Sequence, residues 1–316
     1  MLMLSLRRMR RSVRGQCGRI VAVALLLALC ARGEVFRIAT FNLENYLDSA
    51  AGTRPAKSKE SKAKIRESIL ALRPDVLAVE ELGSASALLE LRDSLREAGL
   101  DLEHWQLLVA GEADIHVGLL SRFPFSASRP HTNETFLLDG RRFHVSRGFA
   151  EVDIQVNPAY RFTLIAAHLK SKRASALADE AQIRLEEARL LREKIDSVLT
   201  ANPNANLVVL GDFNDTKDSE STKAILGRGK TRLVDTRPAE KNGDGSHEGA
   251  EQENRTITWT HYYAKEDSYR RIDFILLSRG MAQEWLAEGT YVLALPNWGV
   301  ASDHRPVVAA FEAQDK

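Results

Sequence analysis

The stretch LVVLGDFND, residues 207–215, decides the fold, because an apolar run leads directly into a group of polar side chains. Leu-Val-Val-Leu reaches Gly211, and Asp212, Asn214 and Asp215 follow at once. One interpretation is a plain turn, since Gly, Asp and Asn are the residues that turns use. The other is a metal and phosphate site at the end of a buried strand. This stretch alone does not choose between the two.

Other apolar runs of the chain also deliver polar side chains. Such runs end at Asn42 in RIATFN, at Glu80 and Glu81 in VLAVEE and at His168 in FTLIAAH, and SDHR at 302–305 precedes the last run. Asp273 lies inside the apolar YRRIDFILLS, where a carboxylate is costly to bury unless a proton donor, a cation or a metal pairs with it. Each residue has an ordinary structural explanation by itself, but together they indicate a shared site.

Length and composition fit a globular domain with a large core. The 316 residues include 44% hydrophobic and 28% charged side chains, which is an ordinary globular composition. Strands are predicted at 35–41, 76–80, 116–124, 149–156, 160–168, 207–210, 231–235, 255–260, 271–277, 290–295 and 306–311. Helices are predicted at 57–72, 84–98, 176–199 and 219–227. Several strands are apolar throughout, which indicates sheets buried between helices.

Residues 1–33 differ from the rest of the chain. An arginine-rich segment without acids precedes the apolar run IVAVALLLALCA, and the small-x-small pattern of residues 31–33 follows. This order is typical of a secretory signal peptide with cleavage after Gly33. The run is short for a membrane span, which takes about 20 apolar residues, and an uncleaved anchor is the alternative. We expect a secreted or periplasmic protein with no transmembrane segment in its mature part.

The predicted cleavage changes both charge and cysteine content. Removal of residues 1–33 takes away seven arginines and no acid, and leaves 37 basic and 43 acidic side chains, a net charge of −6. This charge disfavours non-specific DNA binding, although a local basic groove is compatible with it. Cys17 and Cys30 are removed as well, so stability depends on the core and not on disulfides. We expect a monomer.

The polar side chains at the strand ends suit a hard divalent cation. Carboxylate and amide oxygens favour Mg²⁺, Mn²⁺ or Ca²⁺. Zinc would require more His or Cys, and the chain has neither a Cys pair nor an HExxH motif. A Mg²⁺ site with few protein ligands leaves positions for phosphate oxygens and water. Two histidines and an aspartate that is not a ligand can then handle protons and charge on a phosphoryl group.

Seven motifs, in their order along the chain, resemble the endonuclease/exonuclease/phosphatase superfamily. They are IATFNLEN, PDVLAVEEL, VGLLSRFP, AHLK, LGDFND, RRIDFILLS and SDHRP, within residues 35–312. The superfamily includes pancreatic-type deoxyribonucleases, abasic-site endonucleases, bacterial sphingomyelinases and inositol-polyphosphate 5-phosphatases. The resemblance implies an α/β fold in one domain at 34–316, a four-layered α/β/β/α sandwich of two packed mixed sheets flanked by helices. Its active site would lie at one edge of the two sheets.

The resemblance also implies the roles of eight residues. The expected metal site, for Mg²⁺ with Mn²⁺ or Ca²⁺ as alternatives, consists of Asn42, Glu81 and Asp303. Asp212 would orient or deprotonate the attacking water, Asn214, His168 and His304 would contact the phosphoryl group, and Asp273 would fix the tautomer and charge of His304. Asp215 is assigned to the turn. The implied reaction is in-line attack of water on a phosphate ester.

The chain departs from the family pattern at two positions. The usual Gln before the metal-binding Glu is here Glu80, which either tightens metal binding or faces solvent. Abasic-site endonucleases have a Tyr in place of His168, and pancreatic-type enzymes have cysteines that the mature chain lacks, so neither branch fits closely. Four cations near the motifs either contact phosphates or form surface salt bridges: Arg122, Arg147, Lys170 and Arg271.

Three functions are compatible with these residues. The leading one is an exported Mg²⁺-dependent phosphodiesterase, foremost a nuclease acting on nucleic acid. A phospholipid phosphodiesterase of the sphingomyelinase kind is an alternative, because Trp285, Tyr291, Pro296 and Trp298 either touch a membrane or form a core strand, and a phosphomonoesterase is another enzymatic alternative. A non-catalytic binding module is disfavoured by the complete set of ligands. Trp259, Tyr262 and Tyr263 either stack on bases or belong to the core, and loops 43–60, 125–147 and 237–270 are expected to select the substrate.

Overall fold

The computed structural model describes residues 33–111, 114–242 and 258–314. The chain divides into the units Met1–Glu34 and Val35–Lys316, and the following concerns the second unit. The predicted signal peptide lies outside the described residues, apart from Gly33, and stays a prediction. Within the described ranges, no helix combines the length and the apolar character needed to cross a membrane.

Two large mixed sheets form the centre of this unit. The seven-stranded sheet contains, in spatial order, β12 (Ala239–Asn242), β16 (Trp285–Ala294), β17 (Val307–Ala313), β1 (Glu34–Tyr46), β2 (Val76–Leu82), β4 (His116–Ser121) and β3 (His104–Leu108). The six-stranded sheet contains β11 (Val234–Asp235), β15 (Asp273–Leu277), β10 (Leu207–Asp212), β9 (Tyr160–Ala167), β8 (Phe149–Asn157) and β5 (Phe125–His131). Both sheets contain parallel and antiparallel pairs.

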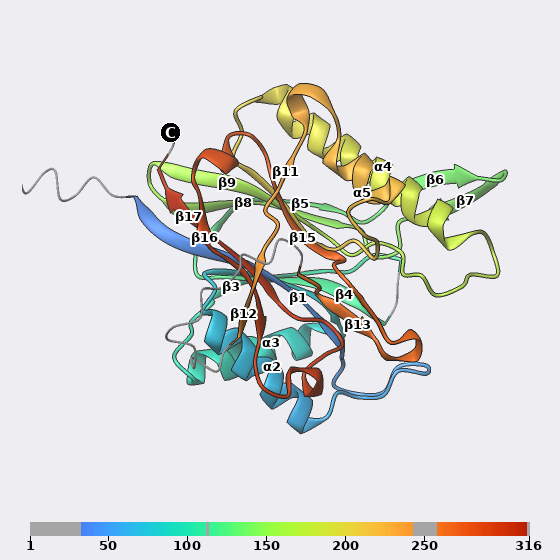
Figure 1. The fold of residues 1–316 in the computed structure, drawn as a ribbon, viewed down its shortest axis with the longest axis horizontal. Coiled ribbons are helices and arrows are strands. Elements are labelled where there is room, and N and C mark those ends of the chain that lie inside the picture. The colour runs from blue at the N-terminus through green and yellow to red at the C-terminus, as the bar shows by residue number, and fades with distance from the viewer. Residues whose placement is uncertain (1–32, 112–113, 243–257, 315–316) are drawn as a thin grey trace, which may run out of the picture. The chain divides into compact units, whose positions relative to one another are not determined.

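Helices cover the outer faces of both sheets, which confirms the predicted four layers. Among the described residues the α-helices are α2 (Lys59–Leu72), α3 (Ala85–Glu97), α4 (Glu180–Ala201) and α5 (Glu220–Leu226). Figure 1 shows α2 and α3 on the seven-stranded sheet and α4 and α5 on the six-stranded sheet. Between the sheets, Phe36 of β1 stacks on Phe162 of β9 at 5.3 Å and on Phe311 of β17 at 5.6 Å. The chain is therefore an α/β/β/α sandwich with a buried aromatic centre.

Each of the four helices begins after a side chain that caps its amino end. Ser58, Ser84, Asp179 and Ser219 accept hydrogen bonds from backbone N–H groups of the first helical turns. Such caps satisfy N–H groups that have no partner inside the helix. The four helices therefore begin within a few residues of the predicted starts.

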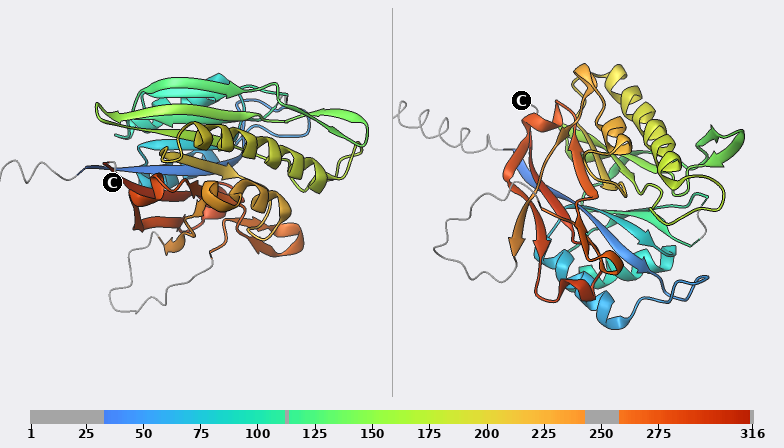
Figure 2. Two further views of the ribbon diagram at one scale, coloured as in Figure 1. Left: turned by 90° about the horizontal axis from the view of Figure 1, so that it is seen from above. Right: turned by 45° about the vertical axis from the view of Figure 1, so that its right-hand side comes forward.

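Two short hairpins add to the sandwich. They are β6 (Thr135–Leu138) with β7 (Arg141–His144), and β13 (His261–Tyr263) with β14 (Ser268–Arg270). The first lies beside α4 in Figures 1 and 2. A strand is predicted at 255–260, of which the structure describes 258–260. For these three residues the prediction is wrong, because they belong to no strand and β13 begins at His261. The strand β3 was not predicted, because HWQLL shows no clear alternation of apolar and polar residues.

Pairing within each sheet aligns the polar strand ends. β1 and β2 are parallel, with Asn42 opposite Glu80, and the carboxyl ends of parallel strands meet at one edge. β10 is antiparallel to β15, and Asp212 lies directly opposite Asp273. A register shift follows Asn42 in β1 and Val79 in β2, and a bulge of this kind changes the direction of the side chains beyond it.

Replacing Gly211 by Ala should destabilise the protein by about 3–5 kcal/mol, because both the backbone angle and the available space exclude a side chain. Gly211 has φ of +128°, and a Cβ there would lie 2.0 Å from the backbone oxygen of Ala167. Urea unfolding measures the loss. Gly299→Ala is the control, since its Cβ would meet nothing within 4 Å, and equal stability of the two variants would contradict the prediction.

Candidate active site

Five of the eight predicted site residues line one cavity of about 550 Å³. They are Glu81, Asp212, Asn214, Asp303 and His304. The other three are buried behind these residues and contact them: Asn42, His168 and Asp273. The structure therefore brings together residues from six separate segments of the chain.

Asp212 is the centre of the arrangement. Its Oδ2 accepts a hydrogen bond from Nδ2 of Asn42 at 3.0 Å, which joins β10 of one sheet to β1 of the other. Asn214 donates its backbone N–H to Oδ1 at 2.8 Å and its side-chain amide to Oδ2 at 3.3 Å. Burial raises the pKa of Asp212 to about 7, against the attraction of His304. Asp212 is thus held rigidly and can accept a proton near neutral pH.

His304 and Asp273 form a buried imidazole–carboxylate pair. Nδ1 of His304 lies 2.9 Å from Oδ2 and 3.1 Å from Oδ1 of Asp273. Burial lowers the pKa of His304, but the charges of Asp273 and Asp212 outweigh it and hold the pKa well above its usual value. Because an ionised carboxylate only accepts, Nδ1 carries the hydrogen. Nε2 faces Asp212 at 3.7 Å and is the nitrogen available to the cavity.

The backbone around His304 is fixed from the other sheet. Ser302 donates its hydroxyl to the backbone oxygen of Asn42 at 2.8 Å and accepts the backbone N–H of His304 at 3.0 Å. Ser302 is fully buried. The bulged end of β1 therefore sets the position of the SDH segment, which no local pattern in the sequence indicates.

His168 is buried with a neutral ring. Its Nε2 lies 3.5 Å from Oδ2 of Asp212. Burial, together with the positive charge of Arg147, lowers the pKa of His168 well below its usual value. A neutral imidazole next to Asp212 can donate or accept a hydrogen bond but supplies no positive charge.

Two of the three residues predicted to hold a metal, Glu81 and Asp303, offer carboxylate oxygens to the cavity. Glu81 lines the cavity, and its Oε2 accepts the backbone N–H of Asn45 at 3.0 Å. The amide oxygen of Asn45 is buried and accepts no hydrogen bond within the described residues. Glu81 and Asn45 both have left-handed backbones, with φ of +58°, an uncommon conformation that concentrates at functional sites. Oxygen donors of this kind are those that hard divalent ions take.

Glu80 does not face solvent, so that alternative for it is wrong. Its side chain is fully buried, and Oε1 accepts the hydroxyl of Thr40 at 2.7 Å. Burial raises the pKa of Glu80 well above its usual value, and the charges of Asp273 and Asp212 raise it further. A protonated Glu80 has the shape and the neutrality of the glutamine that is usual in this motif.

The four cations near the motifs do not line the cavity. Arg122 pairs with Asp75 at 3.0 Å, and Arg271 pairs with Asp235 at 2.6 Å. Arg147 donates to the backbone oxygen of Leu169. Lys170 donates to the backbone oxygens of Ser171 and Arg173. These contacts support structural roles in place of phosphate binding.

Asp215 has the structural role that the sequence suggests. It accepts hydrogen bonds from Arg184 of α4 and Ser221 of α5 and pairs with Lys172 at 3.0 Å. The carboxylate thus ties both outer helices to the end of β10. It does not line the cavity.

Several cavity residues were missed at the level of single residues. The cavity is also lined by His261, Tyr263, Lys265 and Arg270 of the β13–β14 hairpin and by Ser171, Lys172 and Arg173 after β9. The hairpin lies within loop 237–270, which the sequence marks as substrate-selecting without naming these side chains. A polar loop has no periodicity from which the orientation of its residues can be read.

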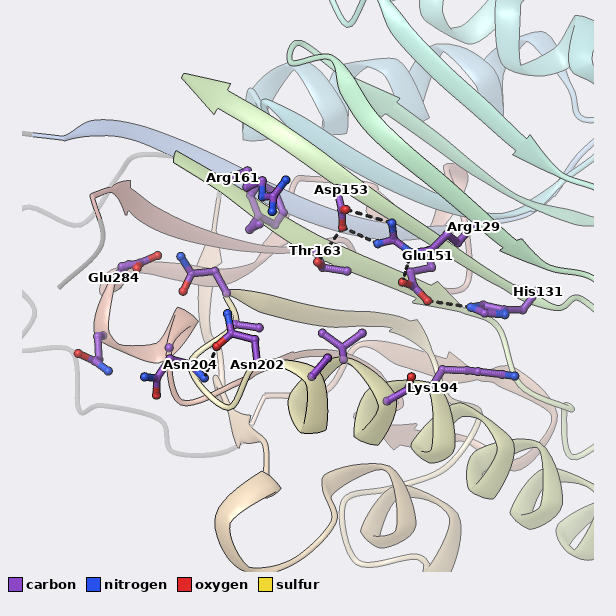
Figure 3. A pocket seen from close by; sticks show the side chains of 18 of the residues that line it. Arg129, His131, Glu151, Asp153, Arg161, Thr163, Lys194, Asn202, Asn204 and Glu284 are labelled. Atoms are coloured by element: carbon purple, nitrogen blue, oxygen red, sulfur yellow. Dashed lines mark hydrogen bonds and ion pairs between the residues drawn. The ribbon is translucent and has the colours of Figure 1, made fainter. Parts of the chain in front are cut away.

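A larger cavity, of about 960 Å³, lies away from these residues, between β5, β8, β9 and α4. Figure 3 shows its charged floor. Arg129 pairs with Glu151 and Asp153 there, and His131 bonds Glu151 at 2.8 Å. Most of its charged side chains have partners, Lys194 with Glu134 among them, and none of the predicted site residues lines it. The smaller cavity is therefore the candidate active site.

The comparisons agree with this geometry. A sequence profile of the endonuclease/exonuclease/phosphatase family matches residues 39–304, a range that contains all eight site residues. The chain belongs to this family. Enzymes of the endonuclease/exonuclease/phosphatase family are metal-dependent phosphoric ester hydrolases, and the chain is assigned to that class of enzyme. No curated protein sequence matches the chain.

Solved structures share the fold over most of the chain. The human Nocturnin catalytic domain with bound sulfate has a TM-score of 0.61 at 17% identity and covers 89% of this chain and 95% of its own. The family member from Bacteroides vulgatus has a TM-score of 0.61 at 16% identity, and the match covers 89% of this chain and 100% of that one. Sphingomyelinase C from Streptomyces griseocarneus has a TM-score of 0.55 at 18% identity, and the match covers 88% of this chain and 100% of that one. Identities this low show the shared fold and do not identify a substrate.

Proposed function

We propose that the protein is an exported, Mg²⁺-dependent phosphodiesterase that hydrolyses nucleic acid. One observation carries the choice of substrate. The cavity that contains Asp212 and His304 is also lined by Arg173, Lys265 and Tyr263. Two exposed cations and an aromatic ring next to the reacting groups suit a substrate that has further phosphates and bases beside the scissile ester.

Asn42, Glu81 and Asp303 are the proposed Mg²⁺ site. Their carboxylate and amide oxygens suit this ion, which binds through few protein ligands and keeps other positions for water and phosphate. A bound Mg²⁺ supplies Lewis-acid polarisation of a phosphoryl oxygen and neutralises its charge. The side chain of Asp303 is 41% exposed, so it can reach an ion in the cavity.

The other residues act on water and phosphate. Asp212 accepts a proton from the attacking water and orients it for in-line attack. The side-chain amide of Asn214 donates to the backbone oxygen of Leu169 at 3.0 Å and to Asp212 at 3.3 Å, and a phosphoryl oxygen can take the place of Asp212 as the second acceptor. Nε2 of His304 donates to a second phosphoryl oxygen while Asp273 stabilises the charged ring. The phosphorus–oxygen bond to the leaving group breaks as the bond to the water oxygen forms.

The cationic wall of the cavity supports a polyanionic substrate. Lys172 pairs with Asp215, and Arg270 lies 3.5 Å from Glu266. Arg173 and Lys265 are exposed, and neither forms an ion pair with a described residue. Within the described residues no acid pairs with these two cations, so they are available for the phosphates that flank a scissile bond.

Replacing both Arg173 and Lys265 by Ala should raise KM for a single-stranded oligonucleotide about tenfold. The same change should leave KM for bis-p-nitrophenyl phosphate within twofold, because that small diester does not reach the flanking phosphates. Each lost phosphate contact also lowers the salt dependence of KM. Lys230→Ala is the control, since Lys230 is exposed and does not line the cavity. Equal effects on both substrates would contradict the nucleic-acid assignment.

A phospholipid substrate has less support. Trp285 donates Nε1–H to Thr290 at 2.7 Å and packs on the core between the sheets, and Tyr291 packs on the core under α2 and α3. Trp298 packs against Trp259 at 5.2 Å. The three aromatic residues thus form no continuous exposed hairpin, and only Pro296 of the four candidates is exposed. Hydrolysis of sphingomyelin vesicles in preference to oligonucleotides would reverse this choice.

Export is proposed from the sequence of residues 1–33. Mass spectrometry of the protein recovered outside the cytoplasm should give a chain that begins at Glu34. Recovery of the uncleaved chain in the membrane fraction would support the anchor instead. The monomeric state stays a prediction, which sedimentation of the purified protein would test.

A further inference from the structure

A third imidazole stands at the rim of the candidate active site, next to Asp303 and His304. His261 forms an isolated antiparallel bridge with His304. Tyr262 donates its backbone N–H to the oxygen of Asp303 at 3.0 Å, so the start of the β13–β14 hairpin runs along the SDH segment. The rings of His261 and His304 are 4.5 Å apart. Backbone pairing therefore holds the imidazole of His261 against the catalytic segment.

The side-chain atoms of these three residues surround a common point. Nε2 of His261 lies 3.5 Å from Oδ2 of Asp303, and Nε2 of His304 lies 3.9 Å from Oδ1 of the same carboxylate. One ligand atom from each of the three residues lies within 4.8 Å of the other two. Metal bonds of about 2.1 Å place two ligands of one ion up to about 4.2 Å apart. Small side-chain rotations are enough to bring all three onto one ion.

The residue behind His304 prepares its Nε2 as a ligand. Asp273 receives the Nδ1 hydrogen at 2.9 Å, so Nε2 is the nitrogen at which an ion on the cavity side would replace the second ring proton. Histidines that bind metals usually donate their other ring N–H to a carboxylate in this way. His304, supported by Asp273, can thus contact a phosphate oxygen either directly through the Nε2 proton or through a cation bound at Nε2.

The type of donor distinguishes this position from the Mg²⁺ site. The proposed Mg²⁺ site takes oxygen donors alone, from Asn42, Glu81 and Asp303, whereas this position shares the carboxylate of Asp303 and adds the imidazole nitrogens of His261 and His304. Imidazole favours first-row transition ions over Mg²⁺ and Ca²⁺. We infer that His261, Asp303 and His304 form a second cation position, selective for a transition ion such as Mn²⁺ or Zn²⁺. This inference rests on the proposed function, because the ion would face the same phosphoryl group.

Mn²⁺ binding in excess Mg²⁺ tests the second position. Mg²⁺ saturates the oxygen site, and the remaining Mn²⁺ binding is measured by calorimetry and by electron spin echo modulation from coordinated ¹⁴N. Wild type should bind one Mn²⁺ with imidazole nitrogen coupling. His261→Gln should weaken this binding at least tenfold. His261→Asp should recover most of it, because a carboxylate replaces the lost ligand, and a purely structural role of His261 would give no such recovery.

The control variant is His144→Gln, since His144 is an exposed histidine on β7 outside the cavity. It should bind Mn²⁺ as wild type does, and circular dichroism confirms folding of every variant. Equal Mn²⁺ affinity and nitrogen coupling in wild type and His261→Gln would overturn the inference, and so would a wild type without nitrogen coupling. Hydrolysis by wild type with Mg²⁺ alone is measured separately, so a failure of the proposed function is distinguished from a failure of the second site.

Discussion

Replacing Asp212 by Asn should lower kcat for bis-p-nitrophenyl phosphate by about 10³-fold at saturating Mg²⁺, within the range of a lost general base. The amide keeps the volume, and its oxygen can keep the hydrogen bond from the backbone N–H of Asn214, so folding is retained. It cannot take a proton from water. It also removes the negative charge that lies 3.5 Å from His168 and 3.7 Å from His304.

Asp218→Asn is the matched control for this change. Asp218 lies six residues along the same segment, pairs with Lys217 and is exposed. We expect its kcat to stay within twofold of wild type. Thermal unfolding of both variants separates lost chemistry from lost folding. If Asp212→Asn retained more than a tenth of the wild-type kcat, the assignment of Asp212 as the water-activating residue would be wrong.

Replacing Asp273 by Asn should lower kcat/KM about 10²–10³-fold, although Asp273 does not line the cavity. The carboxylate holds the Nδ1 hydrogen of His304 and favours the charged ring. An amide carries no charge to favour the charged ring, and its NH₂ group can face Nδ1 as a donor in place of the acceptor oxygen. His304 then presents the wrong tautomer, or no charge, to the phosphoryl group.

A double-mutant cycle checks this dependence. If Asp273 acts only through His304, then Asp273→Asn combined with His304→Gln should be about as slow as His304→Gln alone. Rate losses that multiply would contradict the account, because they would give Asp273 an effect of its own on the reaction. The same cycle measured as Mn²⁺ affinity shows whether Asp273 supports His304 as a ligand.

The strand ends and their polar residues were predictable from sequence, because each apolar run marks a strand and the polar residue after it marks the edge. Asn42, His168 and Asp212 were placed at the site in this way, and Asp273 was placed there because a buried carboxylate needs a partner. The opposition of Asp212 and Asp273 across β10 and β15 was not predictable. Register depends on pairing between strands that lie 60 residues apart.

Glu80 and His261 show the limits of local patterns. Two adjacent glutamates at the end of a strand look alike in sequence, but the register shift after Val79 accompanies a buried Glu80 and a Glu81 that lines the cavity. His261 lies in a polar loop, and only the bridge to His304 reveals it as part of the site. Contacts between distant segments decided both cases.

The most direct test of the central claim is hydrolysis of bis-p-nitrophenyl phosphate by the purified protein with Mg²⁺, with EDTA, and with EDTA followed by excess Mg²⁺. The account predicts hydrolysis with Mg²⁺, loss of at least 100-fold of the rate in EDTA, and recovery when Mg²⁺ is restored, since the cation supplies several kcal/mol of charge stabilisation. Hydrolysis that persists in EDTA, or none with any divalent ion, would contradict a metal-dependent phosphodiesterase at this site.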